Sequence, residues 1–141
     1  MRVNIKIPWL LKCILTLAYA CLIFAASSED TSSIAIPRHV DKLIHFVEFG
    51  FLCLLICWAL SSARIGSKNI YKLILAIGIA SLYGMSDEFH QLFTPNRSVD
   101  IFDWLADTAG AVAAGFLWQM SVYKLQIKEK SLAMDKTTDR M

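Results

Sequence analysis

Acidic side chains, histidines and a glutamine recur at helical spacing within three otherwise apolar stretches of the sequence. Asp41, His45 and Glu48 follow i, i+4, i+7 spacing, which puts them on one face of a helix. Asp103 and Asp107 are likewise one helical turn apart. Groups of these types can transfer protons, hold a metal ion or bind a charged ligand. The complete set is Asp41, His45, Glu48, Asp87, Glu88, His90, Gln91, Asp103 and Asp107.

Two short motifs within this set are compatible with metal binding, although buried ion pairs are the commoner use of such groups. His45 precedes Glu48 by three residues, and Glu88 precedes His90 by two. Imidazole and carboxylate are ligands that zinc and related ions accept. The metal-ligand candidates are therefore His45, Glu88 and His90. Ion pairs between helices are the alternative use of the same groups, and both uses can hold together.

The surrounding sequence is too apolar for an ordinary soluble domain. Of its 141 residues, 56% are hydrophobic and 18% are charged, whereas a typical soluble domain has roughly 45–50% and about 25%. The apolar residues gather in four stretches, each close to the roughly 20 residues that cross a bilayer. This composition excludes a secreted disulfide scaffold and an ordinary cytosolic enzyme. The four stretches are residues 7–26, 42–60, 70–91 and 101–122.

These stretches predict an all-α fold, a polytopic membrane bundle of four transmembrane helices. The first stretch also has features of a cleaved signal peptide, because Arg2 and Lys6 precede it and small residues end it. Its length favours a retained span instead. Residues 1–122 then form a single transmembrane domain, and residues 123–141 form a polar cytoplasmic tail that we expect to be mobile or weakly helical.

The distribution of charge predicts how this bundle is oriented. The N-terminal region through Lys12, residues 61–72 and the tail hold 11 of the 14 basic residues and three of the 12 acidic ones. Four crossings put all three regions on one side of the membrane. Because cytoplasmic loops are rich in lysine and arginine, we expect both termini in the cytoplasm and the acidic regions outside.

The polar side chains enter the predicted spans from the outer end. Glu48 and Asp107 lie about one and a half turns inside their spans, where a charge that faces lipid costs roughly 2.5–3.5 kcal/mol. We therefore expect both carboxylates to turn inward and line an acidic pocket that opens outward between the second, third and fourth spans. Small residues such as Gly84 and Gly110 let these helices approach closely. The candidate counter-groups are Lys42, His45, His90 and Arg97.

Four motifs combine into a more specific pattern than any of the pieces. Asp-Lys-Leu-Ile-His-Phe begins at Asp41, Asp-Glu-Phe-His-Gln at Asp87, Pro-Asn-Arg at Pro95 and Asp-Trp-Leu-Ala-Asp at Asp103. Over roughly residues 41–115, which we take as the motif core of the domain, the sequence resembles the VanZ-like family of small bacterial integral membrane proteins. The resemblance covers a little over half of the chain.

Two positions depart from the family pattern. Many members have glycine where this chain has Asn96, a residue that turns tolerate, and many have asparagine where it has Asp107.

The resemblance implies a multi-pass protein of the bacterial cytoplasmic (inner) membrane, within the cell envelope, and the family is linked to resistance to glycopeptides such as teicoplanin. The motif residues that carry over are Asp41, Lys42, His45, Glu88, His90, Gln91, Arg97, Asp103 and Asp107.

Two functions of different class fit these residues. The first is a non-enzymatic envelope protein whose outward-facing pocket binds a lipid headgroup, a cell-wall precursor or a partner, with Arg97 holding a phosphate or carboxylate. The alternative is a small intramembrane enzyme, with or without a metal, that acts on a lipid-linked envelope substrate. Its general base would be Glu88 or His90, and Asp103 is a further catalytic candidate. The lipid bilayer is the expected partner, and nucleic acid is not. The ligand-binding candidates are Asp41, Lys42, His45, Glu48, Asp87, Glu88, His90, Gln91, Arg97, Asp103 and Asp107.

Overall fold

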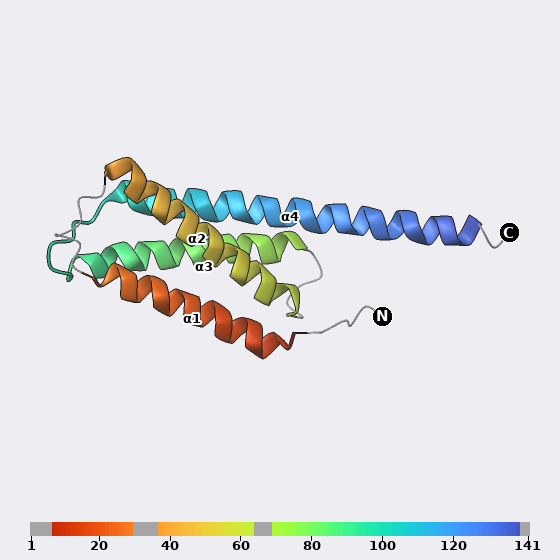
Figure 1. Ribbon diagram of the computed structural model, residues 1–141, viewed down its shortest axis with the longest axis horizontal. Helices are drawn as coiled ribbons and strands as arrows, with labels where there is room; N and C mark the ends of the chain where they lie inside the picture. The colour runs from red at the N-terminus through yellow and green to blue at the C-terminus, as the bar shows by residue number, and fades with distance from the viewer. Residues whose placement is uncertain (1–6, 30–36, 64–68, 139–141) are drawn as a thin grey trace.

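The protein is a bundle of four helices in a computed structural model that describes residues 7–29, 37–63 and 69–138 (Figure 1). All regular structure within these ranges is helical, which confirms the all-α prediction. Several of the basic residues on which the predicted orientation depends lie outside the described residues, namely Arg2, Lys6, Arg64, Lys68 and Arg140. Most of the loop after the first helix also lies outside them. The helices are α1 (Trp9–Ser27), α2 (Arg38–Ser61), α3 (Asn69–Gln91) and α4 (Ile101–Thr138).

Three of these helices, α1, α2 and α3, are long and apolar enough to cross a membrane. Their outer faces carry many exposed large apolar side chains, among them Leu10, Leu22, Leu43 and Leu82. Apolar surface this extensive is rare on a soluble monomer and is covered by lipid in membrane proteins. The described helices therefore support a membrane protein.

Helix α4 is not apolar enough for the same assignment. The acidic residues in its first two turns, Asp103 and Asp107, are both buried against the other helices. Small residues follow on the same face, and Gly110, Ala111 and Ala114 are buried as well. The features that lower the hydropathy of α4 are therefore those that let it pack inside the bundle.

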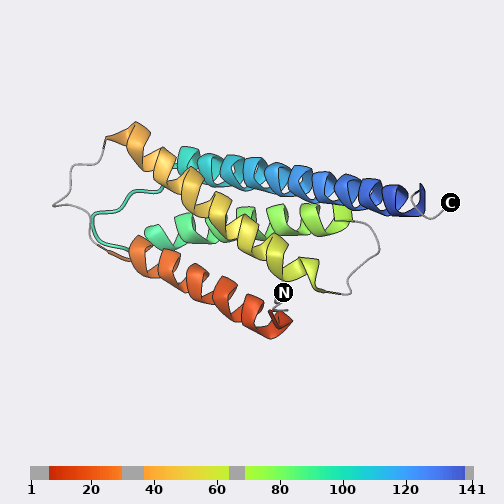
Figure 2. The same ribbon diagram turned by 45° about the vertical axis from the view of Figure 1, so that its right-hand side comes forward.

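Helices α2 and α4 make the most extensive contact, and α1 packs mainly on α2 at the periphery (Figures 1 and 2). At the crossing of α2 and α4, Gly50 faces the Gly110 carbonyl, and Phe46 lies directly over Gly110. Ala76 and Ala80 are fully buried along α3. Small residues thus bring the helices together, as expected where lipid provides no hydrophobic driving force between them.

For the segment from Tyr123 onward, which we expected to be mobile or weakly helical, the structure shows helix, because α4 continues through it as far as Thr138. Figure 1 shows this part of α4 extending beyond the other three helices. It contains no glycine or proline and is rich in lysine, with leucine, glutamine and methionine among its other residues, all of which favour helix. The helix therefore continues on its own propensity after its packing partners end.

The connection between α3 and α4 contains a residue in the left-handed backbone region and ends in a helix cap. Asn96 has a positive φ of 60°, a conformation that glycine adopts freely and asparagine tolerates better than most residues. This explains why an asparagine can replace the glycine that many family members have here. Asp100 caps the start of α4, because its Oδ1 accepts a hydrogen bond from the Phe102 N–H at 2.9 Å.

Candidate functional site

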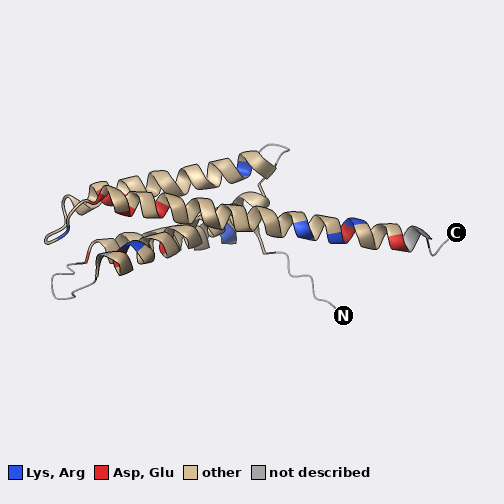
Figure 3. Cartoon of the chain, turned by 90° about the horizontal axis from the view of Figure 1, so that it is seen from above, with Lys and Arg blue, Asp and Glu red and all other residues tan. Residues whose placement is uncertain are grey.

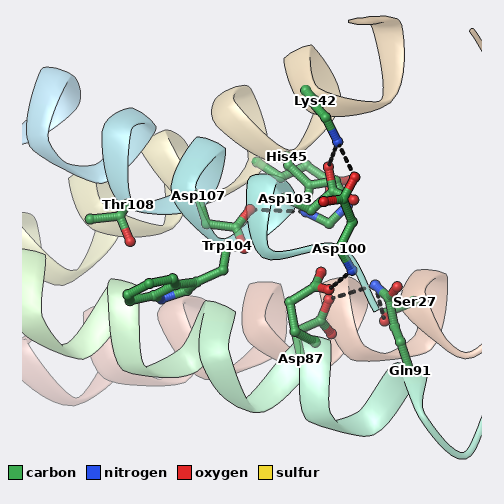
Figure 4. A network of polar contacts seen from close by, with 12 residues as sticks. Ser27, Lys42, His45, Asp87, Gln91, Asp100, Asp103, Trp104, Asp107 and Thr108 are labelled. Atoms are coloured by element: carbon green, nitrogen blue, oxygen red, sulfur yellow. Dashed lines mark hydrogen bonds and ion pairs between the residues drawn. The ribbon is translucent and has the colours of Figure 1, made fainter. Parts of the chain in front are cut away.

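Acidic side chains gather at one end of the bundle, where α1 and α3 end and where α2 and α4 begin (Figure 3). The spacing of the polar residues predicted this convergence. We use the name polar cluster for the side chains that meet there, most of which are labelled in Figure 4. Its members are Lys42, His45, Asp87, Glu88, Gln91, Asp100, Asp103 and Asp107.

Ion pairs join α2 to α4 within the polar cluster. Lys42 Nζ donates to Asp100 Oδ2 at 2.7 Å and to Asp103 Oδ1 at 2.8 Å. One turn further into the bundle, His45 Nδ1 lies 2.9 Å from Asp107 Oδ1, and both of these residues are buried. Successive turns of α2 thus pair with successive turns of α4, which fixes the register of the two helices (Figure 4).

Helix α3 adds two more carboxylates to the polar cluster. Glu88 Oε2 accepts a hydrogen bond from the Asp100 backbone N–H at 3.0 Å. Asp87 Oδ2 accepts one from Gln91 Nε2 at 3.3 Å, and the same nitrogen reaches Ser27 Oγ of α1 at 3.3 Å. All four helices, or the turns next to them, therefore meet at this end of the bundle.

Three buried carboxylate oxygens have no hydrogen-bond partner within the described part of the chain: Asp87 Oδ1, Glu88 Oε1 and Asp107 Oδ2. Their side chains belong to residues that are 4%, 5% and 0% exposed, respectively. Leaving such a group unsatisfied costs roughly 1–3 kcal/mol, and more when it is charged. The polar cluster therefore has acceptor capacity that its own residues do not use.

The polar cluster also contains more acidic groups than basic ones. Its carboxylates come from Asp87, Glu88, Asp100, Asp103 and Asp107, whereas only Lys42 and His45 can carry a positive charge. Unpaired charges are costly in a low-dielectric environment. Protons or bound cations can supply the missing positive charge.

Gly84 makes the burial of Asp107 possible. A Cβ atom on Gly84 would lie 2.6 Å from Asp107 Oδ2 and 3.0 Å from its Cβ. The carboxylate of Asp107 therefore occupies the space that a side chain at position 84 would fill. The small residue at position 84, which the sequence indicated as a site of close helix packing, thus also makes room for a buried carboxylate.

A pocket of about 100 Å³ lies beside the polar cluster. We expected a pocket between the second, third and fourth spans, but α1, α2 and α3 form this one, with Arg97 from the following loop and no residue of α4. Lys42 and His45 bind the α4 carboxylates directly, which closes the side we had expected to be open. The pocket is lined by Ile23, Ala26, Ser27, Asp41, Ile44, His45, Glu48, Asp87, Gln91 and Arg97.

Arg97 lies at the edge of this pocket and caps α1. Its Nε donates to the Glu29 carbonyl oxygen and its Nη2 to the Ala26 carbonyl oxygen, each at 3.3 Å. Cations are favoured near the C-terminal end of a helix, where carbonyl groups have no partner within the helix. Arg97 thus anchors α1 to the loop between α3 and α4.

His90 points away from the polar cluster. Its Nε2 lies 3.0 Å from Ser28 Oγ, and its ring packs on Phe24 with centroids 4.3 Å apart. Because the Ser28 hydroxyl donates to the Phe24 carbonyl oxygen at 2.7 Å, the imidazole N–H is the donor to Ser28. This arrangement does not activate Ser28 as a nucleophile.

The predicted metal ligands are therefore only partly brought together. His45 and Glu88 lie close to each other, and their third neighbour is Asp107, with one potential ligand atom from each within 4.8 Å of the others. His90 is not part of this group. A second group of the same kind consists of Asp41, His45 and Asp103.

Two contributors to the site were missed as site residues. Asp100 was not among the predicted site residues, although its spacing of three and seven residues from Asp103 and Asp107 puts all three on one face. Ser27 was not among them either, and no pattern in the sequence connects it to Gln91. The first could have been found from spacing, whereas the second required the packing of α1.

Membrane-length apolar helices that enclose a buried polar cluster define a helical membrane protein with a polar site at one end. The family model described as VanZ/LLP1 matches residues 9–122 and thus all four helices. The chain belongs to the VanZ/LLP1 family, as the sequence motifs predicted. No curated protein and no solved structure matches it.

Proposed function

We propose that this chain is a four-span, non-enzymatic protein of the bacterial cytoplasmic membrane whose polar end faces outward and binds a lipid-borne ligand. The ligand class is one that carries a primary ammonium next to a phosphate. The observation that carries the proposal is the unpartnered Asp87 Oδ1, a buried carboxylate oxygen on a residue that lines the pocket.

The orientation is supported by the charges at the two ends of the bundle. Lys12 and Lys72 lie near the end opposite the polar cluster, where they bind Ser62 Oγ and the Ala63 carbonyl oxygen, respectively, each at 2.7 Å. The extension of α4 beyond this end carries further lysines, as Figure 3 makes visible. By the positive-inside rule this basic end is cytoplasmic and the acidic end faces out.

The crossing of α4 follows from its place in the bundle. It packs on both α2 and α3, two helices of membrane-spanning length, so its first five to six turns share their depth. A charged residue within the membrane is tolerated when it faces other helices and has a partner, and Asp103 and Asp107 both meet this condition. Both termini then lie in the cytoplasm.

The walls of the pocket suit a small cation. Asp41, Glu48 and Asp87 contribute three carboxylates, and a volume of about 100 Å³ is below the roughly 150 Å³ of a cavity that takes up benzene. An ammonium on a two-carbon arm fits this space, whereas a larger headgroup remains outside. Arg97 at the edge can then meet the phosphate, and Ile44 faces the acyl region.

Native mass spectrometry with added lipids tests this function on the purified full chain. We expect phosphatidylethanolamine to bind more tightly than phosphatidylglycerol, because only the former offers an ammonium to Asp87. Replacing Asp87→Asn should weaken phosphatidylethanolamine binding by about 10–100-fold, since a hydrogen bond to a charged group contributes roughly 1.5–3 kcal/mol. Glu129→Gln, in the exposed extension of α4, is the control and should change nothing.

The outcomes separate the possible ligands. Equal binding of both phospholipids and of a polyprenyl diphosphate, unchanged in Asp87→Asn, would mean that only the phosphate is recognised and would contradict the proposal. Preferential binding of a lipid-linked cell-wall precursor with a free amine, lost in Asp87→Asn, would agree with the proposed ligand class, a primary ammonium next to a phosphate. It would identify the precursor as the molecule that carries this group.

A further inference from the structure

We propose that His45, Glu88 and Asp107 form a binding site for a divalent transition-metal ion, with zinc as the test ion. The three residues come from α2, α3 and α4, and one potential ligand atom from each lies within 4.8 Å of the other two. The proposal does not rest on the proposed headgroup site, because Glu88 and Asp107 do not line the pocket.

Two unsatisfied oxygens point to a missing ligand at this place. Glu88 Oε1 and Asp107 Oδ2 are buried and have no hydrogen-bond partner among the described residues. The other oxygen of each carboxylate is held, by the Asp100 N–H and by His45 respectively. Glu88 is thus fixed through one oxygen and offers the other, as metal-binding carboxylates do when neighbouring groups orient them. Asp107 exchanges its hydrogen bond from His45 Nδ1 for a bond to the ion, which both residues then share.

The spacing of the donor atoms is close to what a tetrahedral ion needs. Donors bound to one zinc at about 2.0–2.2 Å lie about 3.3–3.6 Å apart. His45 Nδ1 and Asp107 Oδ1 are 2.9 Å apart, and the 4.8 Å limit bounds the remaining separations. The three donors are therefore close enough together for one ion to bridge them.

Charge also matches a divalent ion. The carboxylates of Glu88 and Asp107 balance its two charges, and a neutral imidazole adds none. Binding releases the proton that His45 and Asp107 share. A buried site that would otherwise contain uncompensated negative charge then becomes neutral, which removes the penalty described above for unpaired groups.

The ligand types indicate which ions fit. Calcium and magnesium prefer oxygen ligands alone, whereas an imidazole together with carboxylates suits zinc and its neighbours. Three protein ligands leave a fourth position for water or another group. His45 also lines the pocket, so the pocket gives a path from the outer surface to the ion.

The second group, Asp41, His45 and Asp103, is a weaker candidate. Asp103 Oδ1 already binds Lys42 Nζ at 2.8 Å, and Asp41 is only half-buried. Neither residue has an unsatisfied buried oxygen among the described atoms. The site therefore forms on the deeper side of His45, toward α3.

Zinc titration of the chelator-treated, detergent-purified chain tests the proposal, with bound metal counted by elemental analysis. We expect one zinc per chain and an affinity loss of at least about tenfold in Glu88→Gln and in Asp107→Asn. Glu129→Gln removes a glutamate in the exposed extension of α4, outside the polar cluster, and His90→Gln removes a second histidine of this end. Both variants should bind zinc as the wild type does.

Glu88→Gln keeps an oxygen that can accept from the Asp100 N–H, so it should fold, and circular dichroism checks that it does. Cobalt gives a second readout on the wild type, since coordination by one imidazole and two carboxylates yields visible absorption bands. No zinc binding by the wild type would overturn the proposal. Unchanged binding in both ligand variants, or equal loss in Glu129→Gln or His90→Gln, would overturn it as well.

Discussion

Gly110→Ala is expected to destabilise the bundle by at least about 1–3 kcal/mol, the usual cost of an added methyl group in a packed interior. A Cβ at this position would overlap the Phe46 carbonyl oxygen and lie 2.8 Å from its carbonyl carbon. Because these are backbone atoms of α2, no side chain can rotate away, and α2 and α4 must separate. The measurement is the unfolding free energy in mixed micelles of mild detergent and dodecyl sulfate.

Gly78→Ala is the matched control for this substitution. Gly78 is also in mid-helix, but a Cβ there would meet no atom within 4 Å. Alanine should raise the stability of α3 by up to about 1 kcal/mol, because glycine is the poorer helix former. Equal effects of the two substitutions would contradict the close crossing of α2 and α4.

Asp107→Ala is expected to cost about 3–5 kcal/mol, the range for removing one member of a buried ion pair. Asp107 is fully buried and His45 is 8% exposed, so solvent screens their interaction little. The loss of Asp107 leaves His45 without its partner and opens space next to Gly84. Unfolding in the same mixed micelles gives the size of the effect.

A double-mutant cycle attributes this cost to the pair. His45→Ala and Asp107→Ala together should cost clearly less than the sum of the single changes, because either one alone already breaks the interaction. Asp135→Ala in the exposed extension of α4 should stay within about 0.5 kcal/mol of the wild type. Strict additivity at positions 45 and 107 would mean that the pair does not form.

The helices and their buried faces could be predicted well from the sequence. Asp100 and Gln91 mark the start of α4 and the end of α3 as expected, and the positions at helical spacing, such as His45 and Asp107, are buried. Spacing determines which residues share a face, because each helical residue advances by about 100°. It does not determine which helix that face meets, so the participation of α1 in the pocket was not predictable.

His90 illustrates the limit of motif reasoning. It follows Glu88 by two residues in the Asp-Glu-x-His-Gln run, which places the two side chains about 200° apart around α3. Glu88 turns inward to Asp100, while His90 turns to Ser28 and Phe24 of α1. Closeness in the sequence suggested a shared site, and helical geometry separates the two groups.

Gly84 and Asp107 show the opposite case, in which two sequence features that were recognised separately prove to be one. Gly84 was attributed to close helix packing, and Asp107 was noted as a position where many family members have asparagine. In the structure the carboxylate fills the space above Gly84. A search for glycines that face a buried carboxylate on a neighbouring helix could identify such pairs in related sequences.

Cysteine labelling in intact bacterial cells tests the central claim most directly, namely that α4 crosses the membrane with the acidic end of the bundle outside. The background lacks the native cysteines Cys13, Cys21, Cys53 and Cys57. Single cysteines then replace Asn96, in the turn before α4, and Lys128, in its extension; both positions are exposed. We predict that a membrane-impermeant maleimide labels Asn96→Cys in intact cells and Lys128→Cys only after permeabilisation. Labelling of both positions from the same side, or of Lys128→Cys alone in intact cells, would contradict the account.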